Sequence, residues 1–301
     1  MRDANEMTRK YLDSILIEER LIGSDICDLT FDIWGKSFST PITTPAFSHL
    51  KSYGEGRENG LVEYSRAMAQ IGAMNWVGMG DDEAIEPVLK ACPGTVRIIK
   101  PYADRDKIFR QIDFAKANGA VAVGIDTDHI FGMDGGMDVV IGELMAPQSE
   151  AEIREYVEYA QIPFIIKGVL SRNDAIKAAE NGVRGIVVSH HHGRMPYAIP
   201  PLMALPEIRE AMNSYPDMKI FVDCHIDSGA DAYKALALGA DAVSVGRAIL
   251  PSLEKEGMTG VINYIEKMNE ELKTIMNFTG TSNLQSFDSS TLWDINGRHF
   301  K

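Results

Sequence analysis

The chain has 301 residues with a 45% hydrophobic composition, which is enough to bury one substantial core. Its 43 acidic and 30 basic residues give a net charge of −13, and such a field repels nucleic acid and anionic membranes. We therefore expect neither as a partner. A local group of Arg and Lys side chains can still bind an anionic small molecule inside a cleft.

The N-terminal twenty residues lack the apolar run of a signal peptide, and no apolar segment has the length needed to cross a bilayer. The three cysteines, Cys27, Cys92 and Cys224, show no CxxC spacing, which fits a reducing compartment. These features predict a cytoplasmic enzyme.

Taken in chain order, residues 4–20 are expected to form an N-terminal helix. From about residue 40, short apolar runs alternate with amphipathic stretches, which predicts repeated βα units and a parallel sheet. Several runs are apolar at successive positions, as expected when both faces of a strand are covered. The predicted strands are Ile42 to Pro45, Met74 to Met79, Val96 to Lys100, Ala120 to Asp126, Pro163 to Lys167, Gly185 to Ser189, Lys219 to Asp223 and Ala242 to Gly246.

Helix-start signals lie between these runs, at the acids 81–83 and at the capping-box-like segment 171–174. The longest connection, 128–150, follows the fourth strand, and a long C-terminal helix is expected over 252–277. Without a low-complexity linker, residues 1–301 are expected to form a single domain. It would comprise an N-terminal extension (1–39), a barrel core (40–250) and a C-terminal helix and tail (251–301).

Eight βα units in this length favour a closed (β/α)8 TIM barrel, an α/β fold, over an open sheet. The active site of such a barrel lies at the C-terminal ends of its strands. Polar residues gather at these predicted ends, a concentration that favours an enzyme: Lys100, Asp126, Lys167, the run His190 to His192, Asp223 and Arg247.

A phosphate site is predicted after the last two strands. Ser228 and Gly229 follow the seventh strand, and Gly246 and Arg247 follow the eighth, where backbone N–H groups of barrels commonly bind phosphate. The alternative is that the glycines only turn the chain and Arg247 pairs with a surface carboxylate. We favour a phosphate-bearing cofactor.

The other polar residues suggest charge stabilisation and proton transfer. Lys167, beside Gly168, would stabilise negative charge at the barrel mouth or form a Schiff base, unless it only extends to solvent. A histidine of the 190–192 run would act as a general base, and Arg194 would bind a carboxylate. A Zn or Fe site using this run with His129, Asp223 and His225 is an alternative, but adjacent residues rarely bind one metal together, so no metal ligand is expected. Cys224 is expected to be a buried apolar residue rather than a nucleophile.

The segment from Ile165 to Leu250 resembles the FMN-dependent α-hydroxy-acid oxidase and dehydrogenase family. The resemblance rests on IKGVLSRNDAIKAAENGVRGIVVSHHHGR, on ALPEIREA and on DAYKALALGADAVSVGR, with weaker similarity in TTPAF, YADRDKI and GIDTD. It implies a TIM barrel, FMN as the cofactor, an oxidoreductase acting on a small carboxylate substrate, and a homo-oligomer, for example a tetramer.

Individual positions acquire roles from this resemblance. Lys167 would lie beside flavin N1 and O2, His191 would be the catalytic base, and Arg194 would hold the substrate carboxylate. The remaining implied cofactor contacts are Pro45, Ala46, Asp126, Ser189, Asp223, Ser228, Gly229, Gly246 and Arg247. Asp223 would also orient the histidine region, and Lys100 would be a further catalytic group.

Several positions depart from the family pattern. Asp227 stands where the family has a phosphate-binding arginine, and His225 where it has a glycine. Lys100 occupies the place of a catalytic tyrosine, with Tyr102 two residues later, and Met133 that of a second substrate arginine. These departures leave open an FMN barrel with redox-neutral or reductive chemistry, in which Lys100 and His129 would be extra acid or base groups. Also open are a metal-dependent lyase, epimerase or hydrolase and a catalytically inactive binding protein.

Overall fold

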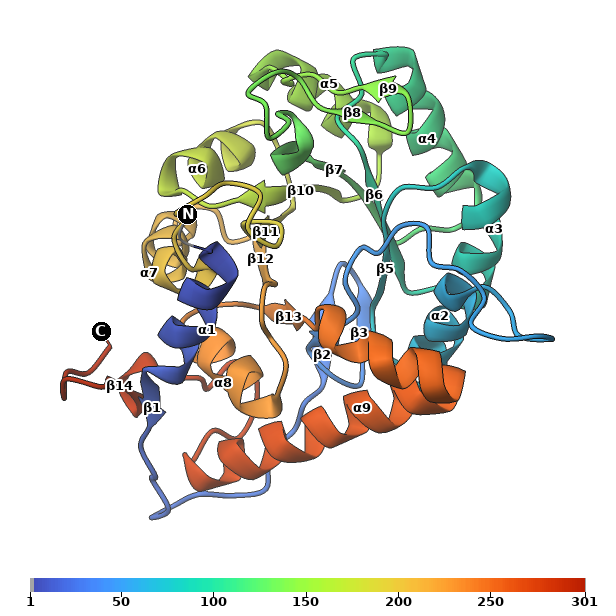
Figure 1. Cartoon of the computed structure of the whole chain (residues 1–301). Helices are drawn as coiled ribbons and strands as arrows, with labels where there is room; N and C mark the ends of the chain where they lie inside the picture. Colours follow the sequence, from blue (N-terminus) through green and yellow to red (C-terminus); the bar gives the residue numbers. More distant parts are fainter. Residues whose placement is uncertain (1–2, 301) are drawn as a thin grey trace.

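The computed structural model describes residues 3–300, and its centre is an eight-stranded parallel sheet rolled into a barrel (Figure 1). The strand order is β4-β13-β12-β11-β10-β7-β6-β5, and a parallel bridge between Phe47 and Val77 joins the two ends. The strands are β4 (Ile42–Thr43), β5 (Asn75–Val77), β6 (Thr95–Ile99), β7 (Ala122–Asp126), β10 (Phe164–Val169), β11 (Gly185–Val188), β12 (Lys219–Val222) and β13 (Ala242–Ser244). All eight predicted strands and the TIM-barrel fold are confirmed.

Helices form a ring outside the strands (Figure 1). They are α2 (Gly60–Ile71), α3 (Asp82–Ala91), α4 (Arg105–Ala117), α5 (Glu150–Ala160), α6 (Arg172–Glu180), α7 (Pro201–Met212), α8 (Gly229–Ala237) and α9 (Leu250–Phe278). The expected start signals are present, because the side chains of Asp81 and Ser171 accept backbone N–H groups at the N-termini of α3 and α6. The C-terminal helix predicted over 252–277 is α9.

Two apolar cores explain why the strands carry apolar residues on both faces. The larger core lies between strands and helices, and the smaller fills the barrel, where the Trp76 and Phe221 rings pack edge to face with centroids 4.9 Å apart. The hairpin of β2 (Phe31–Ile33) and β3 (Lys36–Phe38) adds three buried side chains to the smaller core. It closes the amino-terminal end of the barrel, which leaves the opposite end for a site.

The expectation of a helix over residues 4–20 is wrong in its second half. Helix α1 covers Ala4–Asp13, and the chain then forms β1 (Ile15–Ile17), which pairs antiparallel with β14 (Leu292–Asp294). A pairing partner about 280 residues away overrides the local helical pattern, and no single-segment signal reveals it. Helix α1 itself lies beside α7 and α8, over the carboxyl ends of the barrel strands (Figure 1).

The long connection after β7 is ordered. It begins with the 3-10 turn η1 (Thr127–His129) and contains a hairpin of β8 (Val139–Val140) and β9 (Glu143–Leu144). Two further 3-10 turns are η2 (Arg247–Ile249), directly after β13, and η3 (Ser289–Thr291), directly before β14. The connection therefore presents a defined surface to the barrel mouth.

Candidate active site

Three buried charged side chains meet at the carboxyl ends of β6, β7 and β10. Asp126 accepts hydrogen bonds from both lysines: Lys100 Nζ lies 2.6 Å from Oδ2, and Lys167 Nζ lies 3.2 Å from Oδ1. The three strands are neighbours in the barrel, so their polar ends lie side by side. The structure thus brings together three of the residues predicted from the sequence.

His191 joins this cluster from the loop after β11. The strand ends at Val188, and the chain then turns through left-handed conformations at His191 (φ 45°) and His192 (φ 57°). The backbone N–H of His191 donates to Ser189 Oγ at 3.0 Å, and the imidazole Nδ1 lies 2.9 Å from Lys167 Nζ. The turn carries His191 into the cluster, whereas His190 packs against α1 through a 2.7 Å contact between its Nε2 and Thr8 Oγ1.

Asp128 is a site residue that the sequence reasoning missed. Its Oδ1 lies 2.5 Å from His191 Nδ1, closer than the 3.3 Å between that nitrogen and Asp126 Oδ1. The available signal was its spacing, because Asp128 follows Asp126 by two residues in a tight turn at a strand end. His191 therefore contacts two carboxylates on the side away from its Nε2.

Mutual electrostatics set the protonation states in this cluster. Burial works against the charge of Asp126, but Lys167, His191 and Lys100 hold its pKa well below the usual range. Burial and the charge of Asp126 raise the pKa of Asp128 to about 6. Burial opposes the charges of Lys167 and His191, but the two aspartates outweigh it and raise both pKa values.

Arg194 lies at the edge of the cluster and is already paired. Its Nη2 donates to Asp138 Oδ2 at 2.6 Å and to the carbonyl oxygen of Phe131 at 2.8 Å. His129 is part of the same group, because its Nδ1 lies 3.1 Å from Asp138 Oδ2. Burial and the charge of Lys100 lower the pKa of His129 to about 4, so its imidazole is neutral at neutral pH. Asp138 was not anticipated from the sequence.

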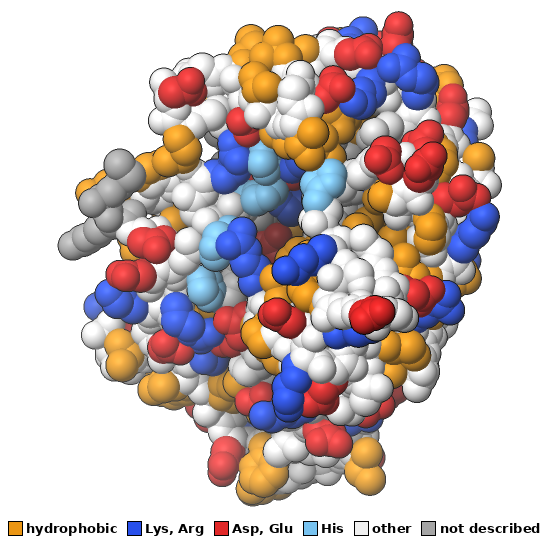
Figure 2. Space-filling model, turned by 45° about the vertical axis from the view of Figure 1, so that its right-hand side comes forward, with side chains coloured by type: hydrophobic (Ala, Val, Ile, Leu, Met, Phe, Trp, Pro, Cys, Tyr) orange, Lys and Arg blue, Asp and Glu red, His pale blue; other side chains and the backbone are white. Residues whose placement is uncertain are grey.

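A cavity of about 430 Å³ opens beside His191, within the usual size range of ligand sites. Figure 2 shows histidines with Lys and Arg side chains gathered around a hollow on this face. Lys167 lies at one part of the wall and Arg247 at another, and the segment after β4 supplies apolar contacts. The predicted site residues that line it are Pro45, Ala46, Lys167, His191, Asp223, Gly246 and Arg247. A larger cavity of about 840 Å³ lies beside α3 and α4 and is lined by none of the predicted site residues.

Ser228 and Gly229 are not among the residues that line the cavity. Ser228 caps α8 by accepting the N–H of Asp231, and the N–H of Gly229 donates to Glu271 Oε2 at 2.8 Å. Two N–H groups of the helix terminus that was expected to meet a phosphate are therefore already satisfied, that of Asp231 by the Ser228 hydroxyl and that of Gly229 by the Glu271 carboxylate. Gly246 and Arg247, the other two residues of the predicted phosphate site, do line the cavity.

The residues that depart from the family pattern have a defined geometry. Cys224 (φ 70°) and His225 (φ 62°) adopt successive left-handed conformations without being glycine. Asp227 turns its carboxylate towards His225, with 3.4 Å between Oδ2 and Nδ1, and both residues line the cavity beside Arg247. Cys224 Sγ donates to Asp223 Oδ1 at 2.9 Å, and burial raises the pKa of the thiol. The Asp227 carboxylate thus lies against the His225 imidazole.

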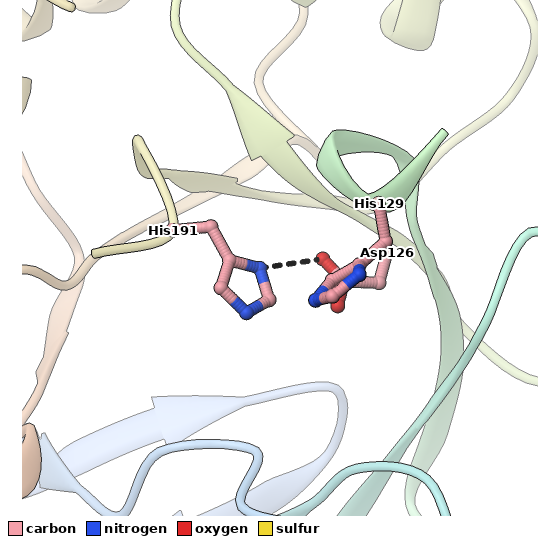
Figure 3. A group of neighbouring side chains, drawn as sticks. All are labelled: Asp126, His129 and His191. Carbon is pink, nitrogen blue, oxygen red and sulfur yellow. Dashed lines mark hydrogen bonds and ion pairs between the residues drawn. The ribbon is translucent and has the colours of Figure 1, made fainter. Parts of the chain in front are cut away.

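Asp126, His129 and His191 present ligand atoms within 4.8 Å of one another, a spacing that could hold a metal ion (Figure 3). However, both oxygens of Asp126 accept hydrogen bonds from lysine ammonium groups. A metal cation would lie beside Lys100 and Lys167, and this repulsion disfavours binding. The arrangement is suited to moving protons rather than to holding a metal.

The cavity is suited to a phosphate-bearing flavin, because a buried lysine lines it, apolar side chains follow β4, and Gly246 and Arg247 lie near the start of η2. A TIM barrel with this site defines the class of barrel oxidoreductases that use a nucleotide cofactor. The family model described as FMN-dependent dehydrogenase matches residues 132–294, and the chain belongs to that family. It is an FMN-dependent oxidoreductase.

Known proteins resemble the chain over most of its length. Human 2-hydroxyacid oxidase 1 is 27% identical over 304 residues, covering 87% of this chain and 80% of the human protein. Spinach (Spinacia oleracea) glycolate oxidase is 28% identical over 330 residues, covering 95% and 87%. A mandelate oxidase variant solved with an FMN adduct superposes with a TM-score of 0.84 at 24% identity, over 97% of this chain and 91% of the other. The resemblance to the FMN-dependent hydroxy-acid oxidases inferred from the sequence is confirmed.

Among the helices of residues 3–300, none is both long enough and apolar enough to span a membrane.

Proposed function

We propose that this enzyme oxidises a small 2-hydroxy carboxylate. The observation that carries the proposal is the position of His191, which lines the cavity while Asp128, Asp126 and Lys167 surround its Nδ1. A base held in this way keeps a fixed orientation towards a substrate in the cavity. The hydroxy-acid substrates of the relatives that their names state, glycolate among them, are of the same class.

His191 Nε2 is the atom that takes the substrate proton in this proposal. As the imidazole becomes positively charged, the carboxylates of Asp128 and Asp126 stabilise it from the Nδ1 side. FMN, when bound, accepts the two electrons that leave the substrate carbon. The protein therefore needs to hold one proton on His191 during the transfer.

Lys167 and Arg194 supply the positive charge. Lys167, whose pKa is raised by Asp126 and Asp128 against the effect of burial, stays protonated and would stabilise negative charge on a bound flavin. Arg194 holds the substrate carboxylate through its guanidinium. The cofactor would be held in the cavity by Pro45, Ala46, Asp223, Gly246 and Arg247. The basic side chains of Lys167 and Arg247 would face its anionic parts.

We also propose that the chain is a single domain and a homo-oligomer, as the family resemblance implies. One cooperative unfolding transition and a mass several times that of the 33.2 kDa chain in light scattering are the expected results. A monomer in solution would contradict the second proposal.

Anaerobic reduction of the bound flavin by a panel of 2-hydroxy acids tests the activity. We expect flavin bands in the purified protein and bleaching by at least one small member of the panel. His191→Asn should slow bleaching by a factor of roughly 10² or more, since general bases contribute about that much. His299→Asn, at an exposed histidine whose ring lies against Trp293 of β14, is the matched control. If no 2-hydroxy acid reduces the flavin-loaded protein, the proposed oxidation of a 2-hydroxy carboxylate is wrong, and redox-neutral or reductive chemistry is favoured.

A further inference from the structure

The guanidinium of Arg194 is occupied by a carboxylate of the protein itself. Asp138 Oδ2 lies 2.6 Å from Arg194 Nη2 and also 3.1 Å from His129 Nδ1. Both side chains are mostly buried, with 24% of Arg194 and 19% of Asp138 exposed, so water screens the pair only in part. Asp138 thus makes the contact that the proposed function gives to the substrate carboxylate.

The backbone holds Asp138 in this place. Its N–H donates to the carbonyl oxygen of Ile130 at 2.9 Å, and its carbonyl oxygen accepts the N–H of Met145 at 2.9 Å. The same segment is bonded to the loop after β6, because Ala103 N–H donates to the carbonyl oxygen of Leu144 at 2.8 Å. These bonds involve only main-chain atoms at position 138, so a side-chain substitution leaves them in place.

Arg194 has capacity for a further acceptor. Its Nε is buried and has no hydrogen-bond partner among residues 3–300, although a buried donor normally finds one. Because Nε is covered by its surroundings, an incoming carboxylate can bind Nε and one terminal nitrogen as a bidentate pair only after that cover moves. It could do so only if Asp138 gave up at least part of its contact, since two carboxylates on one guanidinium repel each other.

We infer that Asp138 is an internal competitor that a substrate carboxylate must displace from Arg194, so that the segment 130–146 sets specificity. The inference rests on the proposed function of Arg194. It predicts weaker binding of small carboxylates than the free arginine would give. Substrates with a strong, compact anionic group are favoured over neutral analogues that cannot displace Asp138.

Oxalate binding to the FMN-loaded enzyme, followed through the flavin absorption spectrum, tests the inference without turnover. Asp138→Asn keeps the shape of the side chain and removes its charge, and we expect it to lower the oxalate Kd about tenfold. Asp138→Ser is the second variant, in case the asparagine still holds the guanidinium. Asp134→Asn is the matched control, because Asp134 lies in the same segment and its one side-chain hydrogen bond is to the N–H of Gly136. The neutral probe glycolamide should bind all four proteins alike.

Steady-state kinetics gives an independent readout. With a 2-hydroxy acid that reduces the wild type, KM should fall in Asp138→Asn while kcat stays within about twofold, because displacing Asp138 is a cost of binding. An oxalate Kd that is unchanged or higher in both Asp138 variants would overturn the inference and make Asp138 a residue that only positions Arg194. If oxalate binds more tightly but no hydroxy acid is oxidised, the inference stands and the proposed function fails.

Discussion

Gly168 lies so close to Asp128 that any side chain at position 168 would displace this aspartate. A β-carbon on Gly168 would lie 2.6 Å from Asp128 Oδ2 and 2.7 Å from its Cγ. Gly168 also has a φ of 96°, a conformation that side chains disfavour. The space beside Lys167 that the sequence indicated is therefore filled by the second carboxylate of the cluster.

Gly168→Ala should displace Asp128 from His191 and lower activity. The left-handed backbone alone costs roughly 1–2 kcal/mol when a β-carbon is added. Gly119→Ala is the matched control, because Gly119 has a φ of 80° and its β-carbon would meet nothing within 4 Å. Thermal unfolding should show the backbone cost in both variants and a further loss in Gly168→Ala from the contact with Asp128, and flavin reduction by substrate should be slowed only in Gly168→Ala. Equal activity in the two would contradict the role of Asp128.

The rate of flavin reduction should rise as the pH increases through the pKa of His191, which Asp126 and Asp128 raise against the effect of burial. Below that pH the imidazole already carries a proton and cannot take one from the substrate. Asp128→Asn should lower kcat by roughly ten- to a hundredfold. It should also move the acidic limb to lower pH, because His191 loses one of the two carboxylates that raise its pKa.

The direction of the shift in that experiment separates two roles. Loss of rate with an unchanged pH profile would mean that Asp128 only shapes the turn after β7.

Asp126→Asn differs from Asp128→Asn because it removes the partner of both Lys100 and Lys167, and we expect it to lower flavin affinity or folding yield as well as rate.

The hairpin β8–β9 contains an unfavourable turn residue. Ile141 has a φ of 51° and the following Gly142 a φ of 78°, which is the backbone of a type I′ turn. A β-branched residue is strained there, and Ile141 is 69% exposed, so its side chain gains little from packing. Ile141→Asn should stabilise the hairpin by about 1 kcal/mol. Hydrogen exchange of the hairpin amides should slow, and Gly142→Ala should accelerate it; the opposite order would refute the assignment of strain.

Arg9 should contribute to the stability of the whole barrel. Its guanidinium contacts Asp231 at 2.8 Å, and the side chain of Asp231 is only 4% exposed. Among residues 3–300, Arg9→Ala leaves that carboxylate with Ser228 Oγ and the N–H of Asp227 as donors, and we expect a loss of about 2 kcal/mol in urea unfolding. Asp13→Asn removes the exposed partner of Arg9 and should cost under about 0.5 kcal/mol. A similar effect of both variants would show that burial of Asp231 is unimportant.

The fold was largely predictable because each strand is a short apolar run followed by a polar residue. Lys100 and Asp126, 26 positions apart in the chain, could be placed together because adjacent parallel strands end at the same edge. That rule depends only on strand order, which short βα connections determine.

The partners of these residues could not be predicted in the same way. The positions of Asp128 and Asp138 depend on how a connection of more than twenty residues folds, and its turns carry weak signals. Ser228 and Gly229 were expected at the phosphate, but Glu271 of α9 reaches the terminus of α8 from a distant part of the chain. The helix expected to continue to residue 20 ends because β1 pairs with β14.

Helix α1 has a consequence for how the site is assembled. Thr8 and Arg9 contact residues 182 and 222 positions further along the chain, His190 in the loop after β11 and Asp231 in α8. Contacts of such long range form late, because the intervening chain must already be compact. Helix α1, which the ribosome makes earliest of the described helices, therefore has to remain undocked while the barrel forms. The loop that carries His190 to His192 would gain the contact with α1 only when α1 docks on the formed barrel. The site would therefore be completed at the end of folding.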